Sequence, residues 1–293
     1  MSNSSGAAID VKARRVARVI QPQATSDGAG VKLKRSIATS TLNYLDPFLL
    51  FDHFGSDNPN DYIAGFPMHP HRGIETVTYM LAGAVKHRDS NGNGGIIRAG
   101  DVQWMTAGGG IMHEEMPQLE GGRLNGFQLW VNLPARLKMS KPRYQGITAK
   151  DIPSVERDDV QIRVIAGKVG EVEGAVKGIA ADPTYLDVSS PADSLFIHPI
   201  PAGHTAFAYV FAGQGTFGIT ANEDGEAVMA TRLVVFGDGD EVRIRSSANG
   251  VRFLLISGKP LHEPIARYGP FVMNTEAEIE QALLDLRRGT FVK

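Results

Sequence analysis

The chain has 293 residues, of which 42% are hydrophobic and 21% are charged, an ordinary composition for a soluble globular protein. The formal net charge of −2 argues against direct binding to nucleic acid or to an anionic membrane. The absence of cysteine excludes disulfides and thiolate metal sites. The start lacks the apolar core of a signal peptide, and no apolar run approaches the ~20 residues that span a bilayer, so we expect a cytoplasmic protein.

Short β-strands are predicted along most of the chain. Residues 1–15 are small, polar and basic and predict a flexible N-terminal tail. Residues 16–40 alternate apolar and polar side chains around a turn at Ser26-Asp27-Gly28, which indicates a hairpin. Further strands are expected at 74–84, at 127–134 and in several runs from 161 to 258. The charged, proline-containing segment 136–160 is expected to link two halves.

One clear helix is predicted, at the C-terminal end. Thr275 and Glu278 form a capping box, and Gly289 follows as the C-terminal cap. Apolar residues recur at helical spacing, at Ile279, Ala282, Leu283 and Leu286. We assign this helix to packing and not to chemistry.

Two pairs of polar residues stand out in the segment 66–117, namely His69 with His71 and His113 with Glu115. The members of each pair are two residues apart, and such residues point to the same face of an extended strand. On neighbouring strands the pairs would bring three imidazoles and a carboxylate together. Imidazole and carboxylate without thiolate suit a first-row metal, so we predict a metal site at these residues.

The carboxylate and the metal of this site have alternatives. Glu115 is preferred to Glu114, because only Glu115 shares a face with His113. Glu75 has the same parity as His71, but Gly73 between them can reset the register. Iron(II) fits the set best, and nickel, copper, zinc, manganese and cobalt remain open. Only neutral imidazole binds a metal, so metal binding should weaken as the pH falls through ~6.5.

The two halves of the chain resemble each other. Residues 78–83 (TYMLAG) match 208–213 (AYVFAG), and 109–115 (GGIMHEE) match 249–255 (NGVRFLL), which suggests two copies of one all-β unit. At these offsets His69, His71, His113 and Glu115 correspond to Pro199, Pro201, Phe253 and Leu255. None of these four counterparts binds metal, so one metal per chain is predicted, in the first half.

The other histidines lack a partner at ligand spacing. We interpret His87, His198, His204 and His262 as structural or exposed. His53 is a candidate for a substrate pocket, with packing as the alternative. The strand at 127–134 alternates strictly, with Phe127 and Leu129 on its apolar face. Gln128 and Trp130, on the opposite face, are the other pocket candidates, with an outward-facing polar side of the strand as the alternative.

Longer stretches resemble the pirin family of the cupin superfamily. HPHRGIETVTYMLAG and AGDVQWMTAGGGIMHEEMP are similar to its two metal motifs. NYLDPFLLFDHF is similar to its N-terminal signature, and PLHEPIARYGPFVMNTEAEIEQA to its C-terminal signature. The resemblance covers nearly the whole chain. It implies an all-β bicupin, with two antiparallel jelly-roll β-barrels and a C-terminal helix, in which His69, His71, His113 and Glu115 bind the metal.

This resemblance divides the chain into three parts. Residues 1–15 are the flexible tail, 16–145 an N-terminal cupin domain with the metal site, and 146–293 a C-terminal cupin domain without metal that ends in the helix. Pirins resemble flavonol dioxygenases in their metal site. The resemblance therefore implies a quercetin 2,3-dioxygenase-like enzyme that opens flavonols such as quercetin with O₂ and releases carbon monoxide. Glu115 would serve as ligand and as catalytic base.

Two other functions stay open. One is a non-enzymatic, iron-containing regulatory or redox-sensing protein that binds a transcription factor or a metabolic enzyme. The other is a sugar isomerase of the cupin type, which would work without oxygen.

Overall fold

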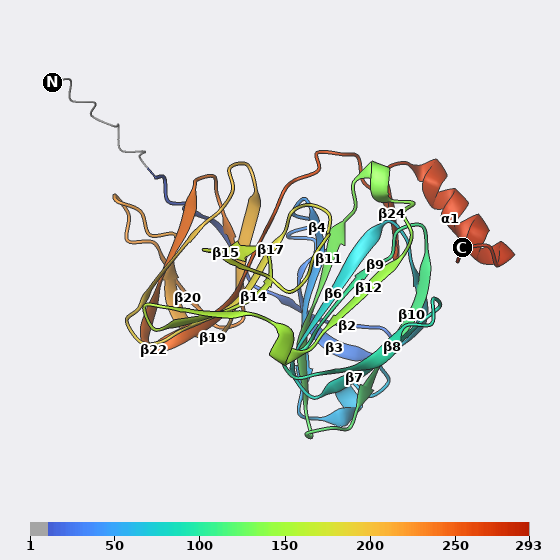
Figure 1. Cartoon of the computed structure of the whole chain (residues 1–293), viewed down its shortest axis with the longest axis horizontal. Coiled ribbons are helices and arrows are strands. Elements are labelled where there is room, and N and C mark those ends of the chain that lie inside the picture. Colours follow the sequence, from blue (N-terminus) through green and yellow to red (C-terminus); the bar gives the residue numbers. More distant parts are fainter. Residues whose placement is uncertain (1–10, 293) are drawn as a thin grey trace.

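The computed structural model describes residues 11–292. Two β-rich halves lie side by side, the first half on the right of Figure 1 and the second on the left. The fold is all-β with two cupin domains and a C-terminal helix, as predicted. The sheets, however, run from one edge strand to another and do not close into barrels, because facing sheets can share a core without sharing hydrogen bonds.

The first half contains a seven-stranded sheet in the order β12-β9-β6-β11-β4-β3-β2 and a four-stranded sheet in the order β5-β10-β7-β8. The larger sheet consists of β2 (Gln23–Asp27), β3 (Val31–Ile37), β4 (Phe48–Ser56), β6 (Ile74–Ala82), β9 (Val102–Thr106), β11 (Leu124–Asn132) and β12 (Arg143–Ile147). The smaller consists of β5 (Phe66–His71), β7 (Ala84–Asp89), β8 (Gly94–Arg98) and β10 (Ile111–Gln118). The predicted hairpin is the β2–β3 pair.

The second half is built on a nine-stranded sheet with the main order β1-β21-β19-β22-β17-β14-β13, to which β18 and β20 add. Its strands are β1 (Val16–Ile20), β13 (Ser154–Arg157), β14 (Val160–Ala166), β17 (Thr184–Ser190), β18 (Leu195–Pro199), β19 (Thr205–Phe217), β20 (Glu226–Met229), β21 (Arg232–Phe236) and β22 (Glu241–Gly258). Two small hairpins complete the strands, β15 (Lys168–Val169) with β16 (Val172–Glu173) and β23 (Ala266–Tyr268) with β24 (Phe271–Met273).

The helices are short apart from α1 (Glu276–Arg288). Thr275 and Glu278 form the predicted capping box, and Gly289 ends the helix in the left-handed region. The 3₁₀ turns are η1 (Pro59–Asp61), η2 (Ala135–Leu137) and η3 (Ala149–Asp151). The segment 136–160, expected as a linker, also supplies β12 to the first half and β13 to the second.

The two halves meet through a large apolar core. Phe127 and Leu129 of β11 are fully buried there, together with Tyr79 of β6 and with Tyr209 and Leu254 of the second half. The alternation predicted for 127–134 is confirmed, because one face of β11 forms this core. The other face of the same sheet is thereby turned toward the interior of the first half.

Both ends of the described chain cross to the opposite half, as Figure 1 shows. β1 pairs with β21 of the second half, and the adjacent Arg14 is buried, with hydrogen bonds from its guanidinium to four carbonyls that include His204 O at 2.8 Å. Residues 1–10 of the expected tail lie outside the described residues. The remaining part, 11–15, is held in the fold.

The C-terminal segment returns to the first half. Lys138 is buried and donates to Gly73 O, Asn132 Oδ1 and Val272 O at 2.7–2.9 Å. Arg72 forms an ion pair with Asp285 of α1 at 2.7 Å. Buried cations of this kind need such partners, since an unpaired buried charge is costly. These contacts fix β23, β24 and α1 against the strands that carry the histidine pairs.

The internal repeat is correct in its first match and misaligned in its second. Tyr79 and Tyr209 occupy equivalent places, because each lies in a strand that pairs with two corresponding neighbours. His113 lies between His69 and Asp89 in its sheet. In the second half it is Ile244 that lies between the corresponding strands, opposite Phe196 and Phe217.

The counterpart of His113 therefore lies in the part of β22 around Ile244 and not at Phe253, which pairs with β17 and β19. The physical reason is that β10 and β11, separate in the first half, run on as one 18-residue strand in the second, which shifts the offset. The same ladders place His198 opposite Val242 where His71 lies opposite Ile111. The second half thus keeps a histidine at the position of His71, and no potential metal-binding group occurs there among residues 146–292.

Glu75 lies on the face of β6 that is turned toward the core between the halves, beside Val77 and Tyr79. Its Oε1 accepts a hydrogen bond from Thr106 at 2.8 Å. The parity with His71 is broken at Gly73, which has a φ of 80°. A Cβ there would lie 2.0 Å from a backbone oxygen of the C-terminal segment, so only glycine fits.

Burial raises the pKa of Glu75 to about 7 from 4.5. Between these values the folded protein holds a proton that the unfolded chain releases, so stability declines as the pH rises through this window. Glu75→Gln remains neutral. We expect it to raise the free energy of unfolding at pH 8 by up to about 3 kcal/mol and to change it little at pH 5, as measured by thermal unfolding. The exposed Glu280→Gln should have no such effect, and a Glu75 variant that is less stable at pH 8 would contradict this account.

Candidate metal centre

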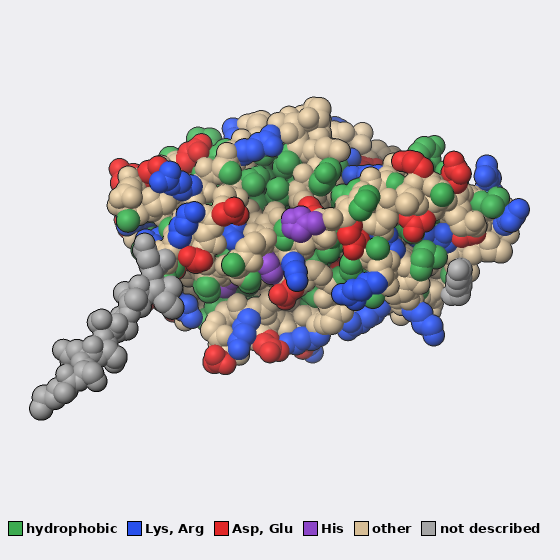
Figure 2. Space-filling view, turned by 90° about the horizontal axis from the view of Figure 1, so that it is seen from above, with side chains coloured by type: hydrophobic (Ala, Val, Ile, Leu, Met, Phe, Trp, Pro, Cys, Tyr) green, Lys and Arg blue, Asp and Glu red, His purple; other side chains and the backbone are tan. Residues whose placement is uncertain are grey.

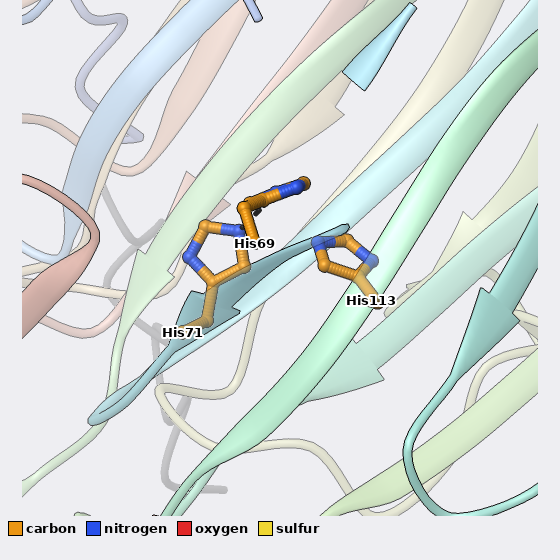
Figure 3. Close-up of side chains that lie close together, drawn as sticks. All are labelled: His69, His71 and His113. Atoms are coloured by element: carbon orange, nitrogen blue, oxygen red, sulfur yellow. Dashed lines mark hydrogen bonds between the residues drawn. The ribbon is translucent and has the colours of Figure 1, made fainter. Parts of the chain in front are cut away.

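Three histidines converge from β5 and β10, as Figure 3 shows. His113 lies opposite His69 in the ladder, and the two ring centroids are 4.3 Å apart. His69 Nε2 and His71 Nε2 are separated by 3.1 Å. One ring nitrogen from each of the three lies within 4.8 Å of the others. The spacing of the residues in the sequence therefore does bring these imidazoles together.

The environment of these rings favours the neutral imidazole, which is the form that binds a metal. His71 and His113 are buried, and burial lowers the pKa of His71 to about 3 and that of His113 well below its ordinary value. Neither ring nitrogen of His113 has a hydrogen-bond partner among the described residues. An unpartnered buried imidazole is costly, and a metal ion would remove that cost. The donor set thus fits a metal. His71 therefore takes up a proton only at a pH far below the ~6.5 expected for an exposed imidazole.

Glu115 lies next to this cluster and is buried. Its Oε1 accepts hydrogen bonds from Thr78 Oγ1 at 2.8 Å and from Gln103 Nε2 at 3.1 Å. The ladder between β10 and β5 shifts register between His113 and Glu115. Glu115 is close to His113 but does not fall within the group formed by His69, His71 and His113.

Sequence reasoning missed His87. This residue forms a second group with His113 and Glu115, again within 4.8 Å. Its ring is buried, stacks on Tyr144 at 4.9 Å and has Nε2 3.5 Å from Asp89. The signal was the alternation of polar and apolar residues in β7, because it places His87 on the same inner face as Val85 and Asp89, which are also buried. The burial of His87 agrees with the structural option predicted for it, but its place beside His113 and Glu115 was not predicted.

A cavity of about 500 Å³ opens beside the three histidines. Its apolar wall includes Leu33, Leu50, Phe54, Phe66 and Trp130, and its polar wall includes Asp27, Arg35, Asp52, Gln128 and Arg267 together with His69, His71 and Glu115. This volume lies within the range of small-molecule sites. Trp130 contacts His71 at 5.0 Å between ring centroids. The two β11 pocket candidates, Gln128 and Trp130, thus line the cavity.

His53 does not line this cavity. Its Nδ1 lies 3.0 Å from Tyr209 Oη and its Nε2 lies 2.8 Å from Asn125 Oδ1. Burial lowers its pKa to about 4. The preceding residue, Asp52, lines the cavity, and successive strand residues alternate, so His53 faces the core between the halves. His53 is therefore a packing residue, which was the alternative to a role in the substrate pocket.

On the face shown in Figure 2, acidic and basic side chains are interspersed. Among residues 11–292, no helix is long and apolar enough to cross a membrane.

Comparisons with known proteins agree with this architecture. The family models described as Pirin and as Pirin C-terminal cupin domain match residues 30–131 and 185–292. A Pseudomonas aeruginosa protein named "Putative quercetin 2,3-dioxygenase" is 46% identical over 90% of this chain and 93% of that protein. A pirin-like protein of Caulobacter vibrioides is 45% identical over 95% of this chain and 99% of its own length.

A solved structure is also similar over nearly its whole length. The crystal structure of a quercetin 2,3-dioxygenase from Acinetobacter baumannii has a TM-score of 0.86 and 35% identity, over 95% of this chain and 98% of that one. The structure has two cupin halves, and one of them contains a histidine cluster. The relatives named above match this chain over at least 93% of their own length. The chain belongs to the pirin family.

Proposed function

We propose that this protein is a metal-dependent dioxygenase that cleaves flavonols such as quercetin with O₂. The observation that carries the proposal is the convergence of His69, His71 and His113 beside an aromatic-lined cavity. The relatives named for quercetin 2,3-dioxygenase activity support the choice of substrate. Iron(II) is the proposed metal, one per chain.

Two overlapping groups compete for that metal. His69 and His71 line the cavity, and so does Glu115. His87 is outside the lining and is covered by Tyr144. A metal that reacts with a substrate needs an open position toward the cavity. We therefore propose His69, His71, His113 and Glu115 as the ligands and His87 as a buried neighbour.

The side chains at the cavity have two proposed roles, which are to accept a proton from the substrate and to enclose its rings. A bound metal would supply Lewis acidity and open coordination positions for the flavonol oxygen and O₂. Glu115 would accept the proton of the flavonol hydroxyl through its free Oε2, because Oε1 is held by Thr78 and Gln103. Thr78 Oγ1 also lies 2.8 Å from Gln128 Oε1, but its single hydroxyl proton serves only one of these two acceptors. The apolar wall holds the planar rings away from water.

The choice between the two groups predicts a difference in metal content. His69→Ala should lower the metal content after reloading, because it removes one of the four proposed ligands and leaves the binding set incomplete. His87→Phe keeps the stacking on Tyr144 and should retain about the wild-type metal content. Both are measured by elemental analysis after purification and reloading with iron(II). Loss of metal in His87→Phe with retention in His69→Ala would place the metal in the other group.

The proposed proton transfer predicts a loss of turnover in Glu115→Gln. We expect oxygen uptake with quercetin to fall by about 10²-fold or more, since a positioned general base contributes that much. Glu114→Gln is the matched control, because Glu114 pairs with Arg88 at 3.0 Å on the other face of β10. Metal content is measured in parallel, so that loss of the ligand can be separated from loss of the base.

Absence of oxygen uptake in wild-type protein loaded with iron, nickel or copper would reject the dioxygenase proposal. In that case the regulatory, non-enzymatic alternative would be favoured.

A further inference from the structure

A second cationic group at the cavity lacks an acidic partner. Arg267 lies on β23, in the C-terminal segment that returns to the first half, and its side chain lines the cavity. Its guanidinium carbon lies 5.1 Å from the centre of the Trp130 ring. Nη1 donates to Leu49 O at 3.2 Å. Within residues 11–292 it forms no ion pair, so most of its five N–H donors stay available.

The other arginine of the cavity, in contrast, is paired with two carboxylates. Arg35 binds both oxygens of Asp52, at 2.8 and 2.7 Å, and Asp27 Oδ2 at 2.6 Å. The remaining oxygen of Asp27 accepts the Gly28 N–H at 2.7 Å. The two carboxylates are thus occupied by Arg35 and a backbone amide. Neither forms a direct contact with Arg267.

The indole ring of Trp130 lies between Arg267 and the candidate metal centre. The Trp130 ring contacts His71 nearly perpendicularly, at 84°, and lies beneath the guanidinium of Arg267. A flat ligand that extends from the histidines toward Arg267 must therefore run along Trp130. Burial and then the charge of Arg35 lower the pKa of Arg267, with Asp27 and Asp52 acting the other way. Arg267 is nevertheless exposed, so its free N–H donors can be reached by a ligand in the cavity.

We propose that Arg267 selects aromatic ligands that carry an anionic group, a carboxylate or an ionised phenol, at the end remote from the metal centre. A guanidinium binds such groups through paired N–H donors. The inference deepens the proposed function and rests on it for the reaction. The binding preference itself does not require turnover.

The test measures binding without oxygen. The probes are 3-hydroxyflavone with a 4′-carboxylate and its neutral methyl ester, titrated calorimetrically into the full chain under anaerobic conditions. We expect wild-type protein to prefer the carboxylate by about tenfold or more, the usual effect of a charged hydrogen bond. Arg267→Gln should abolish this preference and leave the dissociation constant of the ester within about twofold. Arg267→Lys should restore part of the preference, since it keeps the charge.

A separate titration tests an ionised phenol as the anionic group. Quercetin is titrated at pH 6 and at pH 8.5, and the gain in affinity at the higher pH should be smaller in Arg267→Gln than in wild type. Arg123→Gln removes the same charge from an exposed site away from the cavity and should behave as wild type. Thermal unfolding of each variant shows that it is folded.

The outcomes are distinct from those for the enzymatic activity. An Arg267→Gln variant that binds charged and neutral probes with equal losses, or with no change in either, would overturn the inference. Charge-selective binding that depends on Arg267, in a protein that consumes no oxygen with quercetin, would sustain it and reject the dioxygenase proposal instead.

Discussion

The seven-stranded sheet of the first half separates two environments, and the rest of the structure depends on this constraint. Its outer face packs on the second half through Tyr79, Phe127 and Leu129. Its inner face carries Thr78, Gln128 and Trp130 toward the cavity and the histidines. Because strand residues alternate, each apolar contact between the halves also sets the orientation of a polar neighbour inside.

The C-terminal segment completes the cavity from far along the chain. Lys138 and Arg72 hold it through buried polar contacts, and Arg267 then lies at the cavity wall. The second half thus contributes to the site of the first half in two ways. It packs on the outer face of the seven-stranded sheet, and the C-terminal segment that completes the cavity extends from it. Within residues 146–292 the second half has no group of potential metal ligands, so its contribution to the site is structural.

The two halves show what the same scaffold does with different side chains. Where the first half has His113 between His69 and Asp89, the second has apolar side chains around Ile244 that fill its interior. An interior filled by aromatic and branched side chains is stabilising. The buried imidazoles of the first half give up that packing, and a metal ion would offset the cost.

The sequence by itself determined much of this protein. The strand alternation of β11, the capping box of α1 and the two histidine pairs are local patterns, because side-chain direction and helix capping depend on residues a few positions apart. The length and order of the family motifs identified the bicupin. These features needed no knowledge of which strands are neighbours.

Only the tertiary structure decided the rest. His87 joined the site because β7 lies beside β10, Glu75 turned away because Gly73 breaks the register, and the counterpart of His113 proved to lie around Ile244 because β22 fuses two strands. Open sheets replaced the expected barrels, and Arg267 reached the cavity from the other end of the chain. Strand pairing, register and the return of distant segments are set by packing between residues far apart in sequence, which a local pattern does not contain.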